Sequence, residues 1–402
     1  MIASGQLVNN NTKIRISKNL SPVYLRIITL VVSLLIGLLI AEAMIRILNT
    51  YRMITLDSSI KTDTRIFSAA RNYAHKPFSN RINQLGDIRT SWFINRLGFR
   101  DGDYTFKKPH NTTRVLALGD SLTFGLGVEN YESYPKILEV ELNKNSNLDK
   151  VYEVLNMGLL GYGAIEYQNT YLEEGRRFKP DIIVIGFFLG NDALDALWFD
   201  INKKAIFLKA VPDMVIPFKV NEFLKNYSSL WIFLLQKYYG WVESQSVDNI
   251  KLVFQNDVKG HMLHDVQIDP SNKYMQKSWN LTEQALGRIV NTAKKSDTKT
   301  LVLLIPTKEQ IIPKEWEKAK SGGHNVDSRL YSDSAPRRIM LELCQKNNWY
   351  CLDLQDQLRK QDDLESLFVR DDFHLSKKGN EVVSNLIFDY LLKNNLIEYQ
   401  RR

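Results

Sequence analysis

Cysteine and histidine are scarce in this chain, which has 402 residues but only two cysteines and six histidines. The two cysteines, Cys344 and Cys351, do not have the spacing of a metal site. His261, His264 and Asp265 have a superficially metal-like spacing, but no further ligand cluster accompanies them, so the sequence predicts no metal site. The chain also lacks an arginine-rich stripe with interleaved aromatic residues. Its net charge of +8 therefore indicates a basic surface rather than nucleic-acid binding.

Acidic residues are missing from the first 26 positions, where Lys13, Arg15, Lys18 and Arg26 precede a long apolar run. The run covers residues 25–45, and its core at 27–41 has no charged residue. As a helix the whole run would span about 31 Å, enough to cross the hydrocarbon core of a bilayer. The basic tail predicts a single-pass membrane protein with a cytoplasmic N-terminus and its main domain outside the cytoplasm.

Two interpretations of this segment place the main domain on the same side. Ala41-Glu42-Ala43 matches the small-x-small pattern of a signal-peptide cleavage site. The preceding tail is long for a signal peptide and apolar residues continue to Leu48, so we favour an uncleaved anchor over a cleaved signal. Outside the cytoplasm the two cysteines could form a disulfide, or they could be two buried thiols. Their spacing leaves both open.

Beyond the anchor, apolar strands alternate with amphipathic helices, which predicts an α/β fold with a parallel sheet covered on both faces. We expect a tail at 1–22, an anchor at 23–46, a connecting segment at 47–110 and one α/β domain at 111–395. The predicted strands are 114–118, 151–157, 182–188, 300–305 and 350–354, and the predicted helices are 134–143, 164–177, 281–295, 335–347 and 377–393.

An insertion at residues 193–279 breaks the alternation. It contains Trp198, Trp231 and Trp241 and the apolar run 230–235. One interpretation is a lid or acyl-binding element that touches the membrane. The other is a helix that completes the core, which we favour because apolar runs of this length are usually buried.

Residues with catalytic chemistry follow successive predicted strands. Ser121 comes directly after the first strand, in Gly119-Asp120-Ser121-Leu122, but a serine hydroxyl is a poor nucleophile without a base. Gly158 follows the second strand, and Asn191 follows the third and could donate to a developing oxyanion. His374, before the last helix, is a candidate base, and Asp371 or Asp372 is close enough in sequence to orient it. In a parallel sheet such groups meet outside the carboxyl ends of the strands.

These four blocks, in this order, resemble the SGNH/GDSL hydrolase family over about residues 111–395 without the insertion. The blocks are Gly119-Asp120-Ser121-Leu122, Asn156-Met157-Gly158, Gly190-Asn191-Asp192, and Asp371 with His374. The resemblance implies a three-layer, flavodoxin-like fold and a serine esterase that needs no metal or cofactor. By match, Ser121 would be the nucleophile, His374 the base and Asp371 the orienting acid, with Asp372 still open. Ser121 N–H, Gly158 N–H and the Asn191 side chain would form the oxyanion hole.

The predicted function is serine-dependent hydrolysis of carboxylic esters outside the cytoplasm, through an acyl-enzyme on Ser121. The alternative is an O-acyltransferase that uses the same residues to modify an envelope polysaccharide or lipid. A non-catalytic binding protein on the same fold is the third hypothesis, and the intact Ser121, Asn191 and His374 argue against it. The expected partners are an acyl-ester substrate and, through the N-terminal helix, the membrane. The segment 95–100 and the anchor also resemble those of membrane-tethered bacterial relatives.

Overall fold

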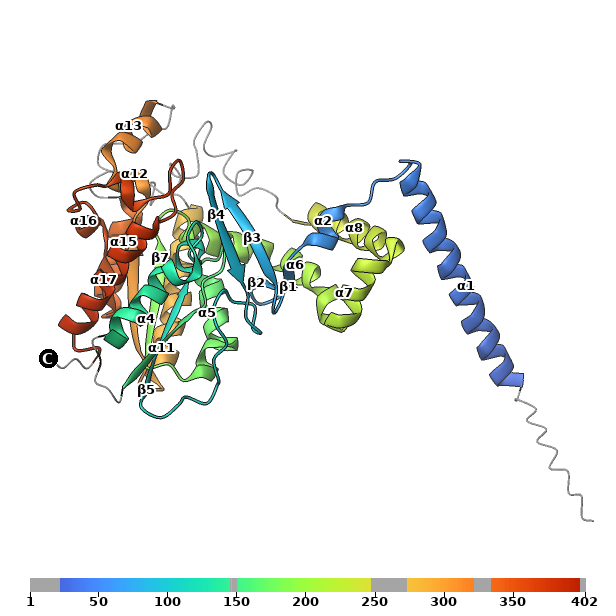
Figure 1. Ribbon diagram of the computed structural model, residues 1–402, viewed down its shortest axis with the longest axis horizontal. Helices are drawn as coiled ribbons and strands as arrows, with labels where there is room; N and C mark the ends of the chain where they lie inside the picture. Colours follow the sequence, from blue (N-terminus) through green and yellow to red (C-terminus); the bar gives the residue numbers. More distant parts are fainter. Residues whose placement is uncertain (1–21, 145, 147–149, 247–272, 322–333, 398–402) are drawn as a thin grey trace, which may run out of the picture. The chain divides into compact units, whose positions relative to one another are not determined.

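The computed structural model describes residues 22–144, 146, 150–246, 273–321 and 334–397 (Figure 1). The N-terminal tail, the residues from His261 to Asp265 and part of the insertion, 247–272, lie outside the described residues. The described chain forms two compact units. One contains α1 together with residues 222–237, and the other contains residues 62–221 and the chain from residue 238 onward.

A five-stranded parallel sheet forms the centre of the larger unit, with the strand order β6-β5-β7-β8-β9. Each strand is a short apolar run, as expected for a sheet buried on both faces. The α/β class with a parallel sheet, predicted from the sequence, is confirmed. The strands are β5 (Thr112–Gly119), β6 (Val151–Asn156), β7 (Ile182–Phe188), β8 (Lys299–Ile305) and β9 (Tyr350–Asp353).

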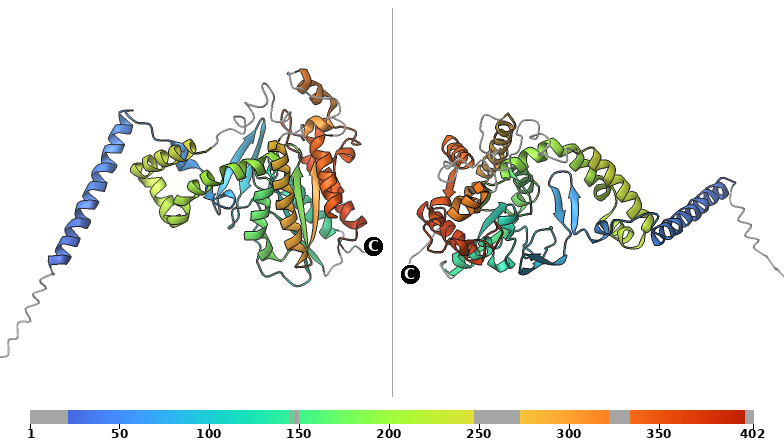
Figure 2. Two further views of the ribbon diagram at one scale, coloured as in Figure 1. Left: turned by 180° about the vertical axis from the view of Figure 1, so that it is seen from behind. Right: turned by 90° about the horizontal axis from the view of Figure 1, so that it is seen from above.

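Helices cover both faces of the sheet (Figure 2). Side chains alternate along each strand, and this alternation divides the core into two clusters. Ile183 and Ile185 of β7 face one cluster, whereas Ile182 and Val184 face the other. The first cluster includes residues of α5 (Ala164–Glu173), α6 (Asp192–Val215), α11 (Lys273–Lys294) and α15 (Ala335–Asn347), and the second includes residues of α4 (Tyr134–Lys144) and α17 (Lys377–Lys393).

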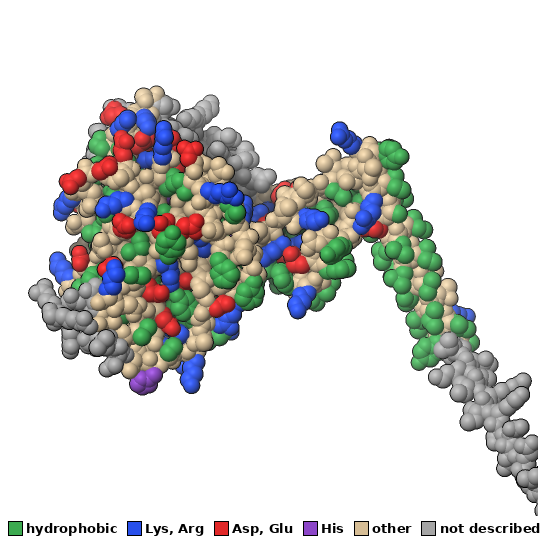
Figure 3. All heavy atoms as spheres, viewed as in Figure 1, with side chains coloured by type: hydrophobic (Ala, Val, Ile, Leu, Met, Phe, Trp, Pro, Cys, Tyr) green, Lys and Arg blue, Asp and Glu red, His purple; other side chains and the backbone are tan. Residues whose placement is uncertain are grey.

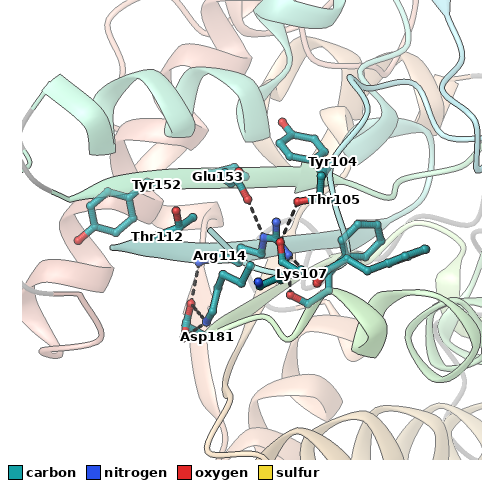
Figure 4. Close-up of polar contacts among 12 residues, drawn as sticks. Tyr104, Thr105, Lys107, Thr112, Arg114, Tyr152, Glu153 and Asp181 are labelled. Atoms are coloured by element: carbon teal, nitrogen blue, oxygen red, sulfur yellow. Dashed lines mark hydrogen bonds and ion pairs between the residues drawn. The ribbon is translucent and has the colours of Figure 1, made fainter. Parts of the chain in front are cut away.

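A buried arginine fixes the register of β5 at the end of the strand opposite Ser121 (Figure 4). The Arg114 side chain has no exposed surface, and its Nε lies 2.6 Å from Glu153 Oε2 on β6. Its Nη1 also donates to the carbonyl oxygen of Phe178 at 3.0 Å, and its backbone N–H donates to Asp181. A buried charge is tolerated only when it is paired and hydrogen-bonded, so this network specifies one register.

Two β-hairpins precede the sheet within 62–110, a segment with few periodic signals in the sequence. They are β1 (Arg65–Ser68) with β2 (Asn72–His75), and β3 (Asn80–Leu85) with β4 (Ile88–Phe93). Trp92 of β4 is buried, and its ring meets that of Phe124 at 4.8 Å between centroids. The second hairpin therefore packs against the short helix that carries Ser121, α3 (Ser121–Phe124).

The described part of the insertion is helical. After α6 come α7 (Phe218–Tyr227) and α8 (Ser229–Ser244). In α8, Ile232 and Leu235 are buried, as expected for a helix that completes a core, but Leu234 is exposed. The run therefore has one buried face and one exposed face, and whether the exposed face acts as a lid or touches the membrane stays a prediction.

The N-terminal helix α1 (Pro22–Thr50) has 29 residues, and an 18-residue window within it has a mean hydropathy of 2.5 with none of that window buried. It is long and apolar enough to cross a membrane. Near the other end of the chain, Cys344 in α15 and Cys351 in β9 form a disulfide, with Cα atoms 6.2 Å apart. This resolves the question that their spacing left open.

Candidate active site

Ser121 lies at the carboxyl end of β5, at the first position of α3. The turn before it is tight. A Cβ on Gly119 would lie 1.9 Å from Thr123 Oγ1, so only glycine fits there. Asp120 caps α3, because its Oδ1 accepts the Leu122 N–H at 2.9 Å. The Ser121 N–H belongs to the helix terminus, where backbone donors have no intrahelical partner.

His374 lies in the loop before α17 and reaches the serine. Its Nε2 is 2.8 Å from Ser121 Oγ, although the two residues are 253 positions apart in the sequence. The loop is fixed by the Val369 N–H, which donates to the His374 carbonyl oxygen at 2.8 Å. The ring of Phe373 stacks on the imidazole at 4.2 Å between centroids. Lys308 donates to the carbonyl oxygen of Asp372 at 2.9 Å, which holds the loop from the side of β8.

The carboxylate beside the imidazole is Asp372, and the sequence-based choice of Asp371 is wrong. Asp372 Oδ1 lies 2.5 Å from His374 Nδ1 and also accepts the His374 N–H at 2.8 Å. Asp371 has a left-handed backbone, with φ of 56°, and its side chain is 85% exposed, near Arg370. A carboxylate readily bonds to the backbone two residues on, and this turn directs Asp372 inward and Asp371 outward.

Asp372 is ionised. Partial burial opposes its charge, but hydrogen bonds from the ring and from the backbone N–H of His374 together hold the pKa of Asp372 below its ordinary value of 3.8. An ionised acceptor at Nδ1 fixes the tautomer in which Nε2 faces Ser121 as a proton acceptor.

Gly158 does not present its N–H to the site. That N–H donates to Asn156 Oδ1 at 3.0 Å, and a Cβ on Gly158 would lie 2.4 Å from the Phe124 nitrogen. Gly158 is therefore the residue that lets the β6 loop pack against α3. Three residues further along the loop, Gly161 has a φ of +64° and open space around it, and within the described chain its N–H has no acceptor.

Asn191 lies at the carboxyl end of β7, directly before α6, as expected for a donor at this edge of the sheet. Its Nδ2 donates to Asp195 Oδ2 at 2.7 Å, and its Oδ1 is buried with no partner among the described residues. Burial, and next the neighbouring Asp120, raises the pKa of Asp195 well above its ordinary value. Asp195 accepts one of the two N–H groups of the Asn191 amide, which leaves the second for a ligand.

Arg100 is a supporting residue whose role the sequence did not reveal. Its guanidinium is buried and donates to the carbonyl oxygens of Gly125 and Val128 at 2.7 Å each and of Ser91 at 3.0 Å. Gly125 is the C-cap of α3, so Arg100 fixes the helix that begins with Ser121. Burial lowers the pKa of Arg100 from 12.5 to about 10, and the side chain stays charged at neutral pH.

Asp101 connects the same segment to the second strand. It accepts the Asn156 N–H at 2.7 Å, and Asn156 Nδ2 in turn donates to the Thr123 carbonyl oxygen at 2.8 Å. Burial raises the pKa of Asp101 from 3.8 to about 6, although Lys136 lies 3.3 Å away. The protonated form is therefore favoured in the folded protein over a wider pH range than in the unfolded chain.

This shift predicts a pH-dependent stability. Between about pH 4 and pH 6 the native state keeps a proton on Asp101 that the unfolded chain releases, so the free energy of unfolding falls by up to about 3 kcal/mol as pH rises. Asp101→Asn keeps an oxygen acceptor and does not titrate. Urea unfolding should show the stability of this variant, relative to wild type, rising by up to about 3 kcal/mol across that window. A difference that stays constant across that window would contradict the assignment, and Asp103→Asn, at an exposed position, is the control variant.

Comparison with known proteins identifies the family. The family model described as the GDSL-like Lipase/Acylhydrolase family matches residues 117–382, more than half of the chain. Among curated protein sequences, none matches the chain.

Solved structures similar to the chain include a lipase/acylhydrolase from Enterococcus faecalis (10% identity, 72% of this chain and 100% of that one, TM-score 0.40). Another is a catalytic mutant of an acetylxylan esterase from Geobacillus stearothermophilus (12% identity, 72% of this chain and 97% of that one, TM-score 0.38). A third is a psychrotrophic esterase from Pseudoalteromonas sp. (13% identity, 71% of this chain and 98% of that one, TM-score 0.37). The family model carries the assignment: the chain belongs to the GDSL-like lipase/acylhydrolase family and is a carboxylic ester hydrolase.

Proposed function

We propose that Ser121 is the nucleophile of this ester hydrolase, His374 its general base and Asp372 the carboxylate that orients the imidazole. The observation that carries the proposal is the hydrogen-bonded series from Ser121 Oγ to His374 Nε2, at 2.8 Å, and from His374 Nδ1 to Asp372 Oδ1, at 2.5 Å. This is the arrangement that converts a serine hydroxyl into a nucleophile.

The reaction then has two halves. Ser121 Oγ attacks the ester carbonyl carbon while His374 Nε2 takes the hydroxyl proton, and the carbonyl oxygen becomes an oxyanion. The tetrahedral intermediate collapses, the C–O bond to the alcohol breaks, and His374 returns the proton to the leaving alkoxide. In the second half, His374 takes a proton from water as the water oxygen attacks the acyl-Ser121 carbonyl carbon. The bond between that carbon and Ser121 Oγ then breaks, His374 returns the proton to Oγ, and the acid leaves. Asp372 stays ionised throughout and stabilises the imidazolium.

Three donors are proposed for the oxyanion. Ser121 N–H lies at the start of α3, and Asn191 has one amide N–H that Asp195 does not use. For the β6 loop we replace Gly158 with Gly161, because the Gly158 N–H is already bonded to Asn156. Donors that are fixed before the reaction stabilise developing charge without reorganisation, and each is worth about a hundredfold to a thousandfold in rate.

For the location, we propose that α1 crosses the membrane with its N-terminus in the cytoplasm and that the hydrolase unit lies outside. The basic tail supports this orientation, and a disulfide is typical of an oxidising compartment. The hydrogen bonds that Glu42 makes to α8 support an uncleaved anchor, because cleavage after Ala43 would remove Glu42 from the mature protein.

A panel of esters tests the proposed function. We expect the full chain in detergent to hydrolyse esters ranging from acetyl to long-chain acyl groups, with the profile across the panel identifying the preferred acyl group. Measurement of released acid, with Ser121→Ala as the control, reports hydrolysis through Ser121. Failure of a fluorophosphonate probe to label the wild type, or equal labelling of Ser121→Ala, would support the non-catalytic alternative instead.

The same assay separates hydrolysis from acyl transfer. If an envelope-type glycan or lipid accelerates the decay of the acyl-enzyme and appears as the acylated product, the protein is an O-acyltransferase. If free acid is the product at every acceptor concentration, the acceptor is water.

A further inference from the structure

The C-terminal part of α1 is hydrogen-bonded to the turn between α7 and α8. Glu42 accepts hydrogen bonds from Ser228 Oγ at 2.8 Å and from the backbone N–H groups of Ser229 and Leu230 at 2.9 Å each. Ser229 is the first residue of α8, so this carboxylate serves as the N-terminal cap of that helix. The residues that follow, together with the second half of α7, belong to the same compact unit as α1. Here residues 222–237 are called the α7–α8 hairpin.

Arg46 completes the contact one turn further along α1. It forms an ion pair with Glu42 at 2.7 Å, and its Nη2 donates to the carbonyl oxygen of Tyr227, the last residue of α7, at 2.7 Å. The carboxylate therefore meets the positive end of one helix dipole and the guanidinium meets the negative end of the other. One ion pair on α1 thus caps both helices of the hairpin.

These contacts place the hairpin at a defined level along α1. The uncharged part of the apolar run ends at Ala41, directly before Glu42. With a rise of about 1.5 Å per residue, Glu42 and Arg46 lie within about 8 Å of that end. In a helix that crosses a bilayer this is the depth of the headgroup region.

The exposed face of the hairpin is apolar and aromatic. Phe223 and Tyr227 lie one turn apart on α7 and are 61% and 67% exposed, and Leu234 on α8 is 48% exposed. Lys237 and Trp241 follow Leu234 at helical spacing on the same face, and both are exposed. Figure 3 shows that hydrophobic side chains also cover α1. Aromatic side chains with a lysine at the rim are typical of helices that lie in a membrane interface.

We propose that the α7–α8 hairpin is a second membrane-contacting element, which lies in the lipid interface with Phe223, Tyr227 and Leu234 facing the acyl chains. The inference rests on the proposed crossing of the membrane by α1. It goes further because it assigns a lipid contact to a segment about 180 residues away in the sequence. The occupant is a lipid surface rather than a second copy of the chain, because Glu42 and Arg46 hold the hairpin at the level of the headgroups.

Depth measurements on the full chain, reconstituted into phosphatidylcholine and phosphatidylglycerol vesicles, test the proposal. Nitroxide labels are attached to single introduced cysteines at Phe223, Leu234, Leu34 in α1 and the exposed Asn385 in α17, and collisions with oxygen and with a water-soluble nickel chelate are compared. We expect the oxygen-to-nickel ratio at Phe223 and Leu234 to be several-fold higher than at Asn385, and lower than at Leu34.

The outcomes separate the two proposals. If the label at Leu34 is accessible to the nickel chelate, the proposal that α1 crosses the membrane is wrong. If Leu34 is in lipid but the two hairpin positions behave like Asn385, the crossing stands and the hairpin inference is wrong. Shielding of both hairpin positions from both reagents would indicate a second copy as the occupant and would also overturn the inference.

The role of the cap is tested in the same samples. Glu42→Ala removes the acceptor for Ser229 and Leu230, so the label at Leu234 should lose oxygen accessibility. Thr50→Ala, which changes a residue on the same helix that bonds only within α1, is the matched control. Equal accessibility in the two variants would show that Glu42 does not hold the hairpin at this depth.

Discussion

Replacing Ser121 with alanine should lower kcat for ester hydrolysis by about 10⁴-fold to 10⁶-fold. The substitution removes Ser121 Oγ, which lies 2.8 Å from His374 Nε2, and leaves no group at this position that can carry the acyl chain. The remaining oxyanion donors and substrate binding would supply the residual rate. Single-turnover kinetics with an activated ester gives the measurement, since an acyl-enzyme burst should be visible in the wild type and missing in the variant.

Two controls accompany this result: the free energy of unfolding of Ser121→Ala and the activity of an alanine variant at a second serine. Ser121 is buried, and among the described residues His374 is the one hydrogen-bond partner of its Oγ, so the free energy of unfolding should change little. Ser296→Ala, at an exposed position beyond α11, should keep full activity. A Ser121→Ala protein that hydrolyses esters at the wild-type rate would refute the proposed nucleophile.

Asp372→Asn should lower kcat by about 10⁴-fold, and Asp371→Asn should leave it within about twofold of wild type. An amide at position 372 can present an N–H to His374 Nδ1 and so favour the tautomer whose Nε2 carries a proton and cannot accept one from Ser121. It also removes the charge that stabilises the imidazolium. Asp371 is a matched control because it is the same residue type at the adjacent position and its side chain lies in solvent.

The comparison of kcat and KM for the two variants decides between the carboxylates. Because Asp372 contacts the imidazole and not the substrate, its loss should appear in kcat rather than in KM. A large loss in Asp371→Asn together with near-normal activity in Asp372→Asn would restore the sequence-based assignment and contradict the geometry of this loop.

The sequence predicted the sheet well because each parallel strand is a short apolar run. Val184 and Ile185 of β7 face opposite clusters, and a strand that is buried on both faces leaves a continuous hydrophobic signal. The hairpins β1–β2 and β3–β4 left no such signal. Residues of β3 such as Asn80 and Arg81 are exposed, and the burial of Trp92 comes from contact with distant Phe124.

The structure brings Ser121 and His374 together, as the sequence pattern suggested, and it differs from that pattern in two details. Spacing alone favoured Asp371, but the positive φ of that residue turns its side chain outward, and no spacing rule contains this torsion. Likewise two glycines follow β6, and only the structure distinguishes Gly158, which packs on α3, from Gly161. A signal for Asp372 was available, because a carboxylate two residues before a histidine readily bonds to that histidine's own N–H.

The buried guanidinium of Arg100 has a consequence for truncated forms of the protein. A fragment that begins at residue 111, where the α/β pattern starts, would lack Arg100 and leave the carbonyl oxygens of Gly125 and Val128 without their donor. Both contacts lie directly behind the helix that begins with Ser121, so their loss would leave α3 less firmly held. A fragment designed to keep the native active site should therefore include residues 80–101, which act as an intramolecular brace for the nucleophile.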